Sequence, residues 1–337
     1  MTDPITRLTP EEKLLISLCR LDFSEEQKAE IRDLMNEIKD WDHFVKLAND
    51  HGIIALTAHN IRGNGLAGFI QEKTMNLLDN GRMQSMIRNT WLVQRWKEVN
   101  KILCDAGIKH VLLKGMALEH TLYGAMGLRQ MTDNDILVKK EDALKAWLLL
   151  KEYGFQSGII KSPLHRKIIT EIGKHMPTLI KDGYAVEIHH RLFQETEKNT
   201  KLDDAIDNAV EITIEGTKAY ILNDNIHLNY LKEHNKLHLS LEGSQLRLFL
   251  DMELIKPGSA PELPAGFLSN PLNMCLPKQG KNAYRTYFSS LPQGIRFRFL
   301  MGDIFPSLKW MKKRYGCGWA KAILYYPLRL GKVVRLL

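Results

Sequence analysis

A short acidic motif near the middle of the chain constrains the fold most strongly. The run Thr132-Asp-Asn-Asp-Ile-Leu-Val138 joins two carboxylates to three consecutive apolar residues, a pattern that favours a buried strand. Side chains alternate between the two faces of a strand. Asp133 and Asp135 should therefore project from one face, while Asn134 points to the opposite face, toward the core. The motif predicts a sheet that carries paired carboxylates.

A hairpin farther along the chain supplies a third carboxylate. Pro177-Thr-Leu-Ile180 and Ala185-Val-Glu-Ile-His189 flank the turn Lys181-Asp-Gly-Tyr184, and an Asp-Gly pair between two such runs is typical of a β-hairpin. Alternation along the second strand places Glu187 and His189 on one face. His189 then either faces a nucleotide or acceptor, or is only a hydrogen-bonded neighbour of Glu187.

Asp133, Asp135 and Glu187 converge if their two strands are neighbours. Three clustered carboxylates repel one another unless cations neutralise them. Hard oxygen ligands of this kind suit magnesium. Two ions held roughly 3.5 to 4 Å apart could activate an attacking hydroxyl and stabilise a departing pyrophosphate. The sequence therefore predicts a magnesium site with these acids as ligands and catalytic groups.

A predicted junction between a strand and a helix lies upstream of the acidic motif. His110-Val-Leu-Leu113 reads as a buried strand, and Lys114-Gly115 follows it directly. Exposed backbone amides, a helix dipole and a lysine at such a junction favour a bound triphosphate. Arg129, just before the acidic strand, could clamp a phosphate with two hydrogen bonds, although a lone arginine in a loop is more often solvated.

These motifs together resemble a known family, the uncharacterised nucleotidyltransferases of the DNA polymerase β-like superfamily. The resemblance is carried by the order and spacing of several segments, which are Val111-Leu-Leu-Lys-Gly-Met-Ala-Leu118, Tyr123, Arg129, Thr132-Asp-Asn-Asp-Ile-Leu-Val138, Gly154-Phe155 and Val186-Glu-Ile-His-His-Arg-Leu192. It implies magnesium bound by Asp133, Asp135 and Glu187, with the phosphates of ATP or another nucleoside triphosphate meeting Lys114 and Gly115.

Two positions depart from the pattern of that superfamily. Lys114-Gly115 stands where a Gly-Ser pair is common, and Asn134 stands where an apolar residue is usual. A core-facing amide needs a hydrogen-bond partner or costs about 1 to 3 kcal/mol. We therefore expect Asn134 to have such a partner.

The predicted fold class is α+β, a small mixed nucleotidyltransferase sheet flanked by helices. We expect a helical N-terminal region over residues 1–107, where Ser24-Glu-Glu-Gln27 and Asp40 indicate helix starts. The catalytic core should cover 108–195. A mainly helical C-terminal region over 196–337 should hold one hairpin and a linker rich in Pro and Gly near 257–277.

Composition limits the classes of protein that fit the chain. Its 337 residues are 44% hydrophobic and include four scattered cysteines, which argues against a disulfide framework or a cysteine zinc site and favours a reducing cytoplasm. We expect no signal peptide and no transmembrane segment. The net charge of +8 allows a polyanionic partner such as nucleic acid.

Basic residues dominate the C-terminal tail. Only Asp303 opposes the tail's cations, which are Arg296, Arg298, Lys309, Lys312, Lys313, Arg314, Lys321, Arg329, Lys332 and Arg335. The tail could be a solvated basic face or a surface that binds RNA or a membrane.

The expected function is magnesium-dependent transfer of a nucleoside monophosphate from a nucleoside triphosphate to a hydroxyl, with release of pyrophosphate. The acceptor could be a small molecule, a sugar, a protein or RNA. Two alternatives stay open. One is a catalytically degenerate protein that binds nucleotide without turnover, and the other is an RNA or membrane adaptor that uses the basic tail.

Overall fold

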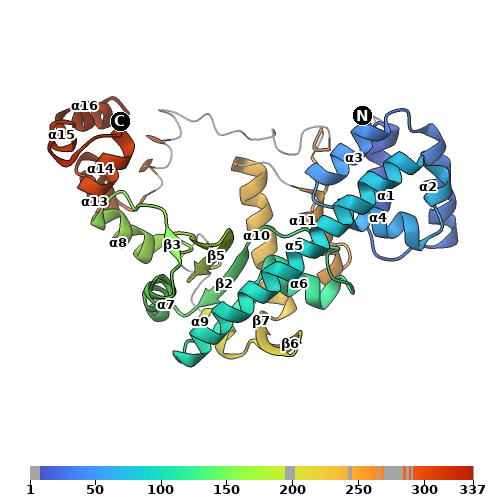
Figure 1. Ribbon diagram of the computed structural model, residues 1–337, viewed down its shortest axis with the longest axis horizontal. Helices are drawn as coiled ribbons and strands as arrows, with labels where there is room; N and C mark the ends of the chain where they lie inside the picture. Colours follow the sequence, from blue (N-terminus) through green and yellow to red (C-terminus); the bar gives the residue numbers. More distant parts are fainter. Residues whose placement is uncertain are drawn as a thin grey trace. The chain divides into compact units, whose positions relative to one another are not determined.

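The computed structural model describes residues 8–193, 202–241, 245–264, 266–268, 284–285, 288–289 and 291–336 (Figure 1). The chain divides into two compact units. One comprises residues 1–100, 111–135 and 208–276, and the other comprises 101–110, 136–207 and 277–337. Of the predicted linker near 257–277, residue 265 and residues 269–277 lie outside the described residues.

Helices make up both ends of the chain. The helices that precede the acidic motif are α1 (Pro10–Leu18), α2 (Glu25–Glu37), α3 (Trp41–Asp50), α4 (Ile54–Gly63), the short 3-10 helix η2 (Ala67–Phe69), α5 (Glu72–Asp105) and α6 (Lys114–Leu122). Those that follow it are α7 (Lys140–Glu152), α8 (Pro163–Ile172), α9 (Leu202–Asp207), α10 (Asp224–Leu241), α11 (Leu246–Ile255), α13 (Gln293–Ile304), α14 (Leu308–Tyr315), α15 (Trp319–Leu324) and α16 (Tyr326–Leu336).

Local sequence sets the starts of the N-terminal helices. The Ser24 hydroxyl accepts a hydrogen bond from the Gln27 amide, and the Gln27 side chain accepts one from the Ser24 amide, which is the predicted capping box. Asp40 caps α3 by accepting from the His43 amide at 2.8 Å. Both predicted helix starts are confirmed, and α1 to α4 gather in one group, drawn in blue in Figure 1.

In the described part of the chain, seven strands form one mixed sheet in the order β3-β4-β5-β2-β1-β7-β6. The strands are β1 (His110–Leu113), β2 (Asn134–Val138), β3 (Gln156–Ser157), β4 (Leu179–Lys181), β5 (Tyr184–His189), β6 (Val210–Ile214) and β7 (Thr217–Ile221). β1 and β7 are parallel, and the pairs β3–β4, β4–β5 and β6–β7 are antiparallel. The predicted fold class, a mixed sheet with helical terminal regions, is confirmed.

Two tight turns close the hairpins. Asp182 and Gly183 both have positive φ, at 50° and 80°, and so do Glu215 and Gly216, at 42° and 75°. Two consecutive residues of positive φ give the type I′ geometry whose twist matches that of paired strands. The turn between β4 and β5 fixes their register, in which Leu179 pairs with Val186, and thereby the face of β5 from which Glu187 projects.

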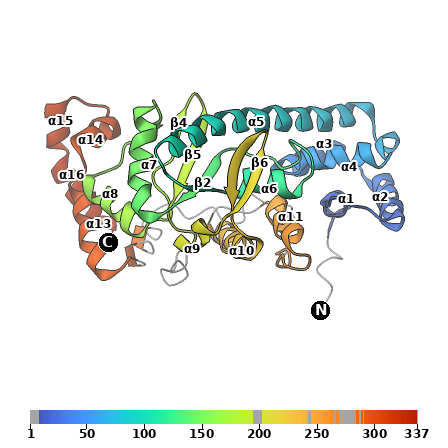
Figure 2. The same ribbon diagram turned by 90° about the horizontal axis from the view of Figure 1, so that it is seen from below.

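Each unit has apolar packing of its own. In the first unit, a large cluster joins buried residues of the N-terminal helices to α6, α10 and α11, among them Leu14, Phe44, Leu118, Leu231 and Phe249. In the second unit, α8 packs against α13 (Figure 2) through a smaller cluster of Ile168, Leu291, Ile295 and Phe299. No helix among the described residues has the length and apolar content that a membrane crossing requires.

Candidate active site

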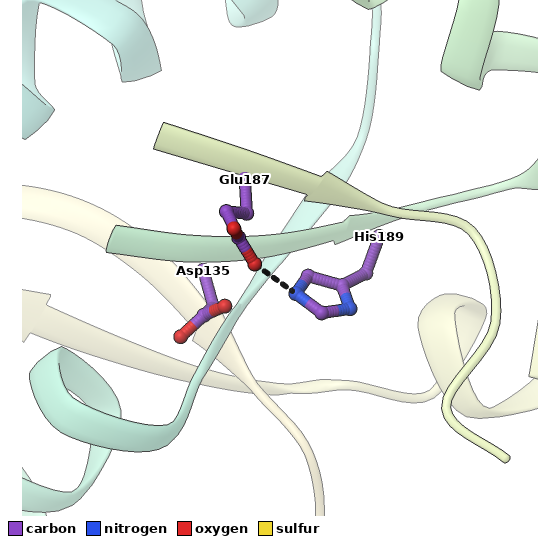
Figure 3. Close-up of side chains that lie close together, drawn as sticks. All are labelled: Asp135, Glu187 and His189. Carbon is purple, nitrogen blue, oxygen red and sulfur yellow. Dashed lines mark ion pairs between the residues drawn. The ribbon is translucent and has the colours of Figure 1, made fainter. Parts of the chain in front are cut away.

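Two carboxylates and an imidazole meet on neighbouring strands of the sheet. Asp135 is the second residue of β2, and Glu187 and His189 lie on β5, which is next to β2 in the sheet. One ligand atom from each of the three side chains lies within 4.8 Å of the other two. Figure 3 shows the Glu187 carboxylate between Asp135 and the His189 ring.

The position of Glu187 is set by two neighbours. The Thr178 hydroxyl donates a hydrogen bond to Glu187 Oε1 at 2.8 Å, and His189 Nε2 lies 3.6 Å from Glu187 Oε2. The His189 ring is buried and packs against the ring of His175, with 5.1 Å between their centroids. Glu187 thus keeps one oxygen near Thr178 and turns the other toward His189.

Lys114 lies against the acidic strand. Its Nζ donates to Asp135 Oδ1 at 3.0 Å, and only 15% of its side chain is exposed. Burial lowers the pKa of Lys114, but the negative charges of Asp135 and Asp133 and the hydrogen bond to Asp135 outweigh burial and hold the pKa above its ordinary value. Lys114 therefore carries a positive charge beside a carboxylate.

The backbone of Lys114 is in the left-handed region, with φ of 46°. This conformation is costly for a residue with a side chain and easy for glycine. The turn from β1 to α6 thus has a backbone conformation that favours glycine, yet a lysine occupies this position. Backbone strain of this kind clusters at functional sites.

Gly115 fits a space that a larger residue would overfill. A Cβ at this position would lie 2.8 Å from Arg129 Nη1 and 2.9 Å from the Met131 side chain. The turn therefore packs directly on the Arg129 guanidinium.

Arg129 is buried and paired. Its Nε donates to Asp251 Oδ1 at 2.9 Å and its Nη2 to Asp251 Oδ2 at 2.6 Å, and Arg129 is only 4% exposed. The Tyr123 hydroxyl donates to Asp251 Oδ1 at 2.7 Å. The sequence expectation of a loop arginine facing solvent or phosphate did not include this partner, because Asp251 is 122 residues away along the chain.

A family model with the description "uncharacterised nucleotidyltransferase" matches residues 37–263. That span is more than half of the chain and contains every residue of the candidate site. The chain belongs to this family. It is thus a nucleotidyltransferase, an enzyme that transfers a phosphorus-containing group. No curated protein and no solved structure matches the chain.

Asp133 occupies a different place from Asp135 in this nucleotidyltransferase. It precedes the first residue of β2, is half-buried, and accepts a hydrogen bond from the Thr132 hydroxyl at 3.1 Å. Asp133 is not one of the three clustered residues, but its charge helps to raise the pKa of Lys114. Asn134 is buried, and its side-chain nitrogen donates to the Leu92 carbonyl at 3.4 Å, so the expected partner is present.

Sequence reasoning missed several residues around the site. Thr178 and Asp251 were not singled out as functional, and neither was Glu119, a buried carboxyl on α6 that accepts from the Asn89 side chain and from the Gly127 amide. Each is a polar residue whose partner is distant in sequence or lies on another strand. Only Asp251 gave a signal, as an acid in the apolar run Leu246-Arg-Leu-Phe-Leu-Asp-Met252.

Proposed function

We propose that this nucleotidyltransferase moves a nucleoside monophosphate from a nucleoside triphosphate to a hydroxyl of its acceptor. The acceptor oxygen forms a bond to the α-phosphorus while the bond from that phosphorus to the bridging oxygen of pyrophosphate breaks. The hydroxyl proton passes to a carboxylate of the site, and pyrophosphate leaves with the bonding electron pair.

The observation that carries this proposal is the cluster of Asp135, Glu187 and His189 beside Lys114. Asp135 and Glu187 supply hard oxygen donors from adjacent strands, the kind that magnesium takes together with substrate phosphates. The donor set fits a divalent cation, since two carboxylates this close are better tolerated when a cation lies between them. Asp133, Asp135 and Glu187 would hold two magnesium ions, with His189 next to Glu187.

Magnesium, when bound, neutralises charge on the phosphates and makes the acceptor hydroxyl more acidic. The protein groups have separate roles. Glu187 accepts the proton of the acceptor hydroxyl, and Thr178 and His189 orient the Glu187 carboxylate. Asp133 and Asp135 hold magnesium, and their negative charges keep Lys114 protonated beside the site.

The turn at Lys114-Gly115 would bind the triphosphate. Lys114 pairs with Asp135 across 3.0 Å, a position from which an ammonium can exchange a carboxylate oxygen for a phosphate oxygen. Gly115 lets the backbone approach closely because it has no Cβ. Arg129 contributes to nucleotide binding by supporting this turn from beneath, with Asp251 fixing its guanidinium.

The test is a transfer assay with nucleotides labelled at the α-phosphate, magnesium, and pooled acceptors of the four classes, with pyrophosphate release measured in parallel. We expect wild type to release pyrophosphate and to label an acceptor. Glu187→Gln should reduce the rate at least a hundredfold because the proton acceptor is lost. Exposed Glu152 on α7 gives the matched control, and Glu152→Gln should retain the wild-type rate.

Two results would overturn the proposal. One is nucleotide binding by wild type with no pyrophosphate release above an Asp133→Asn, Asp135→Asn double variant, which would indicate a degenerate nucleotide-binding protein. The other is equal activity of Glu187→Gln and Glu152→Gln, which would remove Glu187 from the reaction.

A further inference from the structure

The C-terminal helices of the second unit leave large apolar side chains exposed. Leu324 is 74% exposed, Leu328 63%, and Trp319 and Ile323 55% each. All four lie on α15 or α16. Single exposed apolar residues are ordinary on a protein surface, but several on adjoining helices indicate a binding surface.

Exposed basic side chains lie on the same helices and on α14. Six of them are exposed on α14 to α16, namely Lys309, Lys313, Arg314, Lys321, Lys332 and Arg335. No acidic residue follows Asp303 in the sequence. Among the described residues, none of the six lies within ion-pair distance of a carboxylate. The surface therefore keeps its positive charge available to an anionic partner.

The apolar and basic groups are interleaved on the helices. Lys321 is three residues before Leu324, and Lys332 is four residues after Leu328, spacings that place each pair on one helix face. Lys312 Nζ lies 4.2 Å from the centroid of the Trp319 ring, at the edge of a cavity of about 470 Å³ lined also by Lys309 and Lys313. These helices thus present both apolar side chains that can insert into a partner and basic side chains that attract anions.

We propose that α14, α15 and α16 form a docking surface for a bilayer that contains anionic lipids. Apolar side chains flanked by lysine and arginine are typical of helices that lie in the membrane interface, and each basic residue near an anionic surface adds attraction. RNA fits this surface less well. RNA-binding surfaces use cations and aromatic rings for backbone contact and base stacking, and the aliphatic Ile323, Leu324 and Leu328 serve neither purpose.

Vesicle flotation with the full chain tests the proposal. The vesicles are pure phosphatidylcholine, or phosphatidylcholine with about a third phosphatidylglycerol. We expect binding to the anionic vesicles only, weakened by salt. Lys321→Gln with Arg335→Gln should lower the partition coefficient about 25-fold, from about fivefold for each charge. Leu324→Ser with Leu328→Ser should lower it by at least about tenfold, because each leucine that enters the bilayer loses its contact with water.

Matched controls lie outside the surface. Ile87 on α5 is 61% exposed and the Lys73 side chain 74%, and the pair Ile87→Ser and Lys73→Gln should bind vesicles as wild type does. Circular dichroism melting should show that all variants fold, because every substituted side chain is exposed.

Three outcomes would overturn the proposal. The first is no binding to anionic vesicles, and the second is equal binding to pure phosphatidylcholine. The third is that the variant with Lys321→Gln and Arg335→Gln loses binding to single-stranded RNA, while the variant with Leu324→Ser and Leu328→Ser binds both RNA and vesicles as wild type does. The last would assign the surface to nucleic acid. None of these variants touches the candidate active site, so failure here leaves the proposed transfer reaction testable by itself.

Discussion

Arg129 and Asp251 form a buried ion pair held by two hydrogen bonds, at 2.9 Å and 2.6 Å. Asp251 is fully buried and Arg129 nearly so. Asp251→Asn should destabilise the protein by about 3 to 5 kcal/mol, because the Arg129 charge would remain buried without a counter-charge. Urea unfolding of the two proteins measures this difference.

A surface ion pair provides the comparison for that variant. Lys101 and Asp105 are 75% and 65% exposed, and Asp105→Asn should cost less than about 1 kcal/mol because solvent screens such a pair. Equal losses for the two Asp→Asn variants would show that the buried pair does not support the fold.

Gly115 should not tolerate a side chain. The added Cβ of Gly115→Ala would lie 2.8 Å from Arg129 Nη1, so the turn or the buried pair must shift. We expect nucleotide affinity, measured by titration with labelled triphosphate, to fall about tenfold or more. Gly68→Ala is the control, since a Cβ there meets nothing within 4 Å. Wild-type affinity in Gly115→Ala would contradict close packing beneath the turn.

The left-handed backbone of Lys114 can be separated from its charge. Lys114→Ala and Lys114→Gly both remove the ammonium that pairs with Asp135, but only glycine accepts φ of 46° without steric cost. Lys114→Gly should therefore be about 1 kcal/mol more stable than Lys114→Ala in thermal or urea unfolding. Both should bind triphosphate more weakly than wild type. Equal stability of the two variants would show that the backbone conformation stores no strain.

Glu119 should make stability fall as pH rises. Burial raises the pKa of this carboxyl from 4.5 to about 7, even though hydrogen bonds from Asn89 and Gly127 lower it. Both bonds reach Oε1, and the buried Oε2 has no hydrogen-bond partner among the described residues. Between pH 4.5 and 7 the folded protein binds more protons at Glu119 than the unfolded chain does, so the free energy of unfolding decreases with rising pH and stays lower above pH 7.

Glu119→Gln should remove this pH dependence. The amide oxygen can accept the same two hydrogen bonds and carries no charge. We expect little change in stability at pH 5 and a gain on the order of 3 kcal/mol at pH 8. Urea unfolding at both pH values measures this change in the free energy of unfolding. Parallel pH profiles of stability for wild type and Glu119→Gln would show that the Glu119 pKa is not raised.

Thr178 should influence metal binding without being a ligand. Its hydroxyl donates to Glu187 Oε1 at 2.8 Å, and loss of such a supporting hydrogen bond typically weakens metal affinity about 10- to 100-fold. Titration of Thr178→Val with Mn²⁺, followed by electron paramagnetic resonance, should show this loss. Thr170→Val is the matched control, because the Thr170 hydroxyl bonds only within its own helix. Equal affinities in both variants would remove Thr178 from the support of the site.

Local sequence was enough to predict the elements that carry the site. The apolar run Ile136-Leu-Val138 predicted the strand of Asp135, the Asp-Gly turn predicted the hairpin of Glu187, and short-range capping at Ser24 and Asp40 predicted the helix starts. Such features depend on interactions between residues within a few positions of one another, so the local sequence is enough to determine them. The basic tail can also be recognised from composition alone, but composition does not show which of its leucines are exposed.

Tertiary structure decided which side chains meet. Sequence alternation could place Asp133 and Asp135 on one face, but the position of Asp133 before β2 leaves Asp135, Glu187 and His189 as the clustered group. From sequence alone, Arg129 could be assigned only to solvent or to a phosphate. Only the fold brings Asp251 to it, because a buried guanidinium requires a counter-charge and the chain supplies that charge from a distant helix.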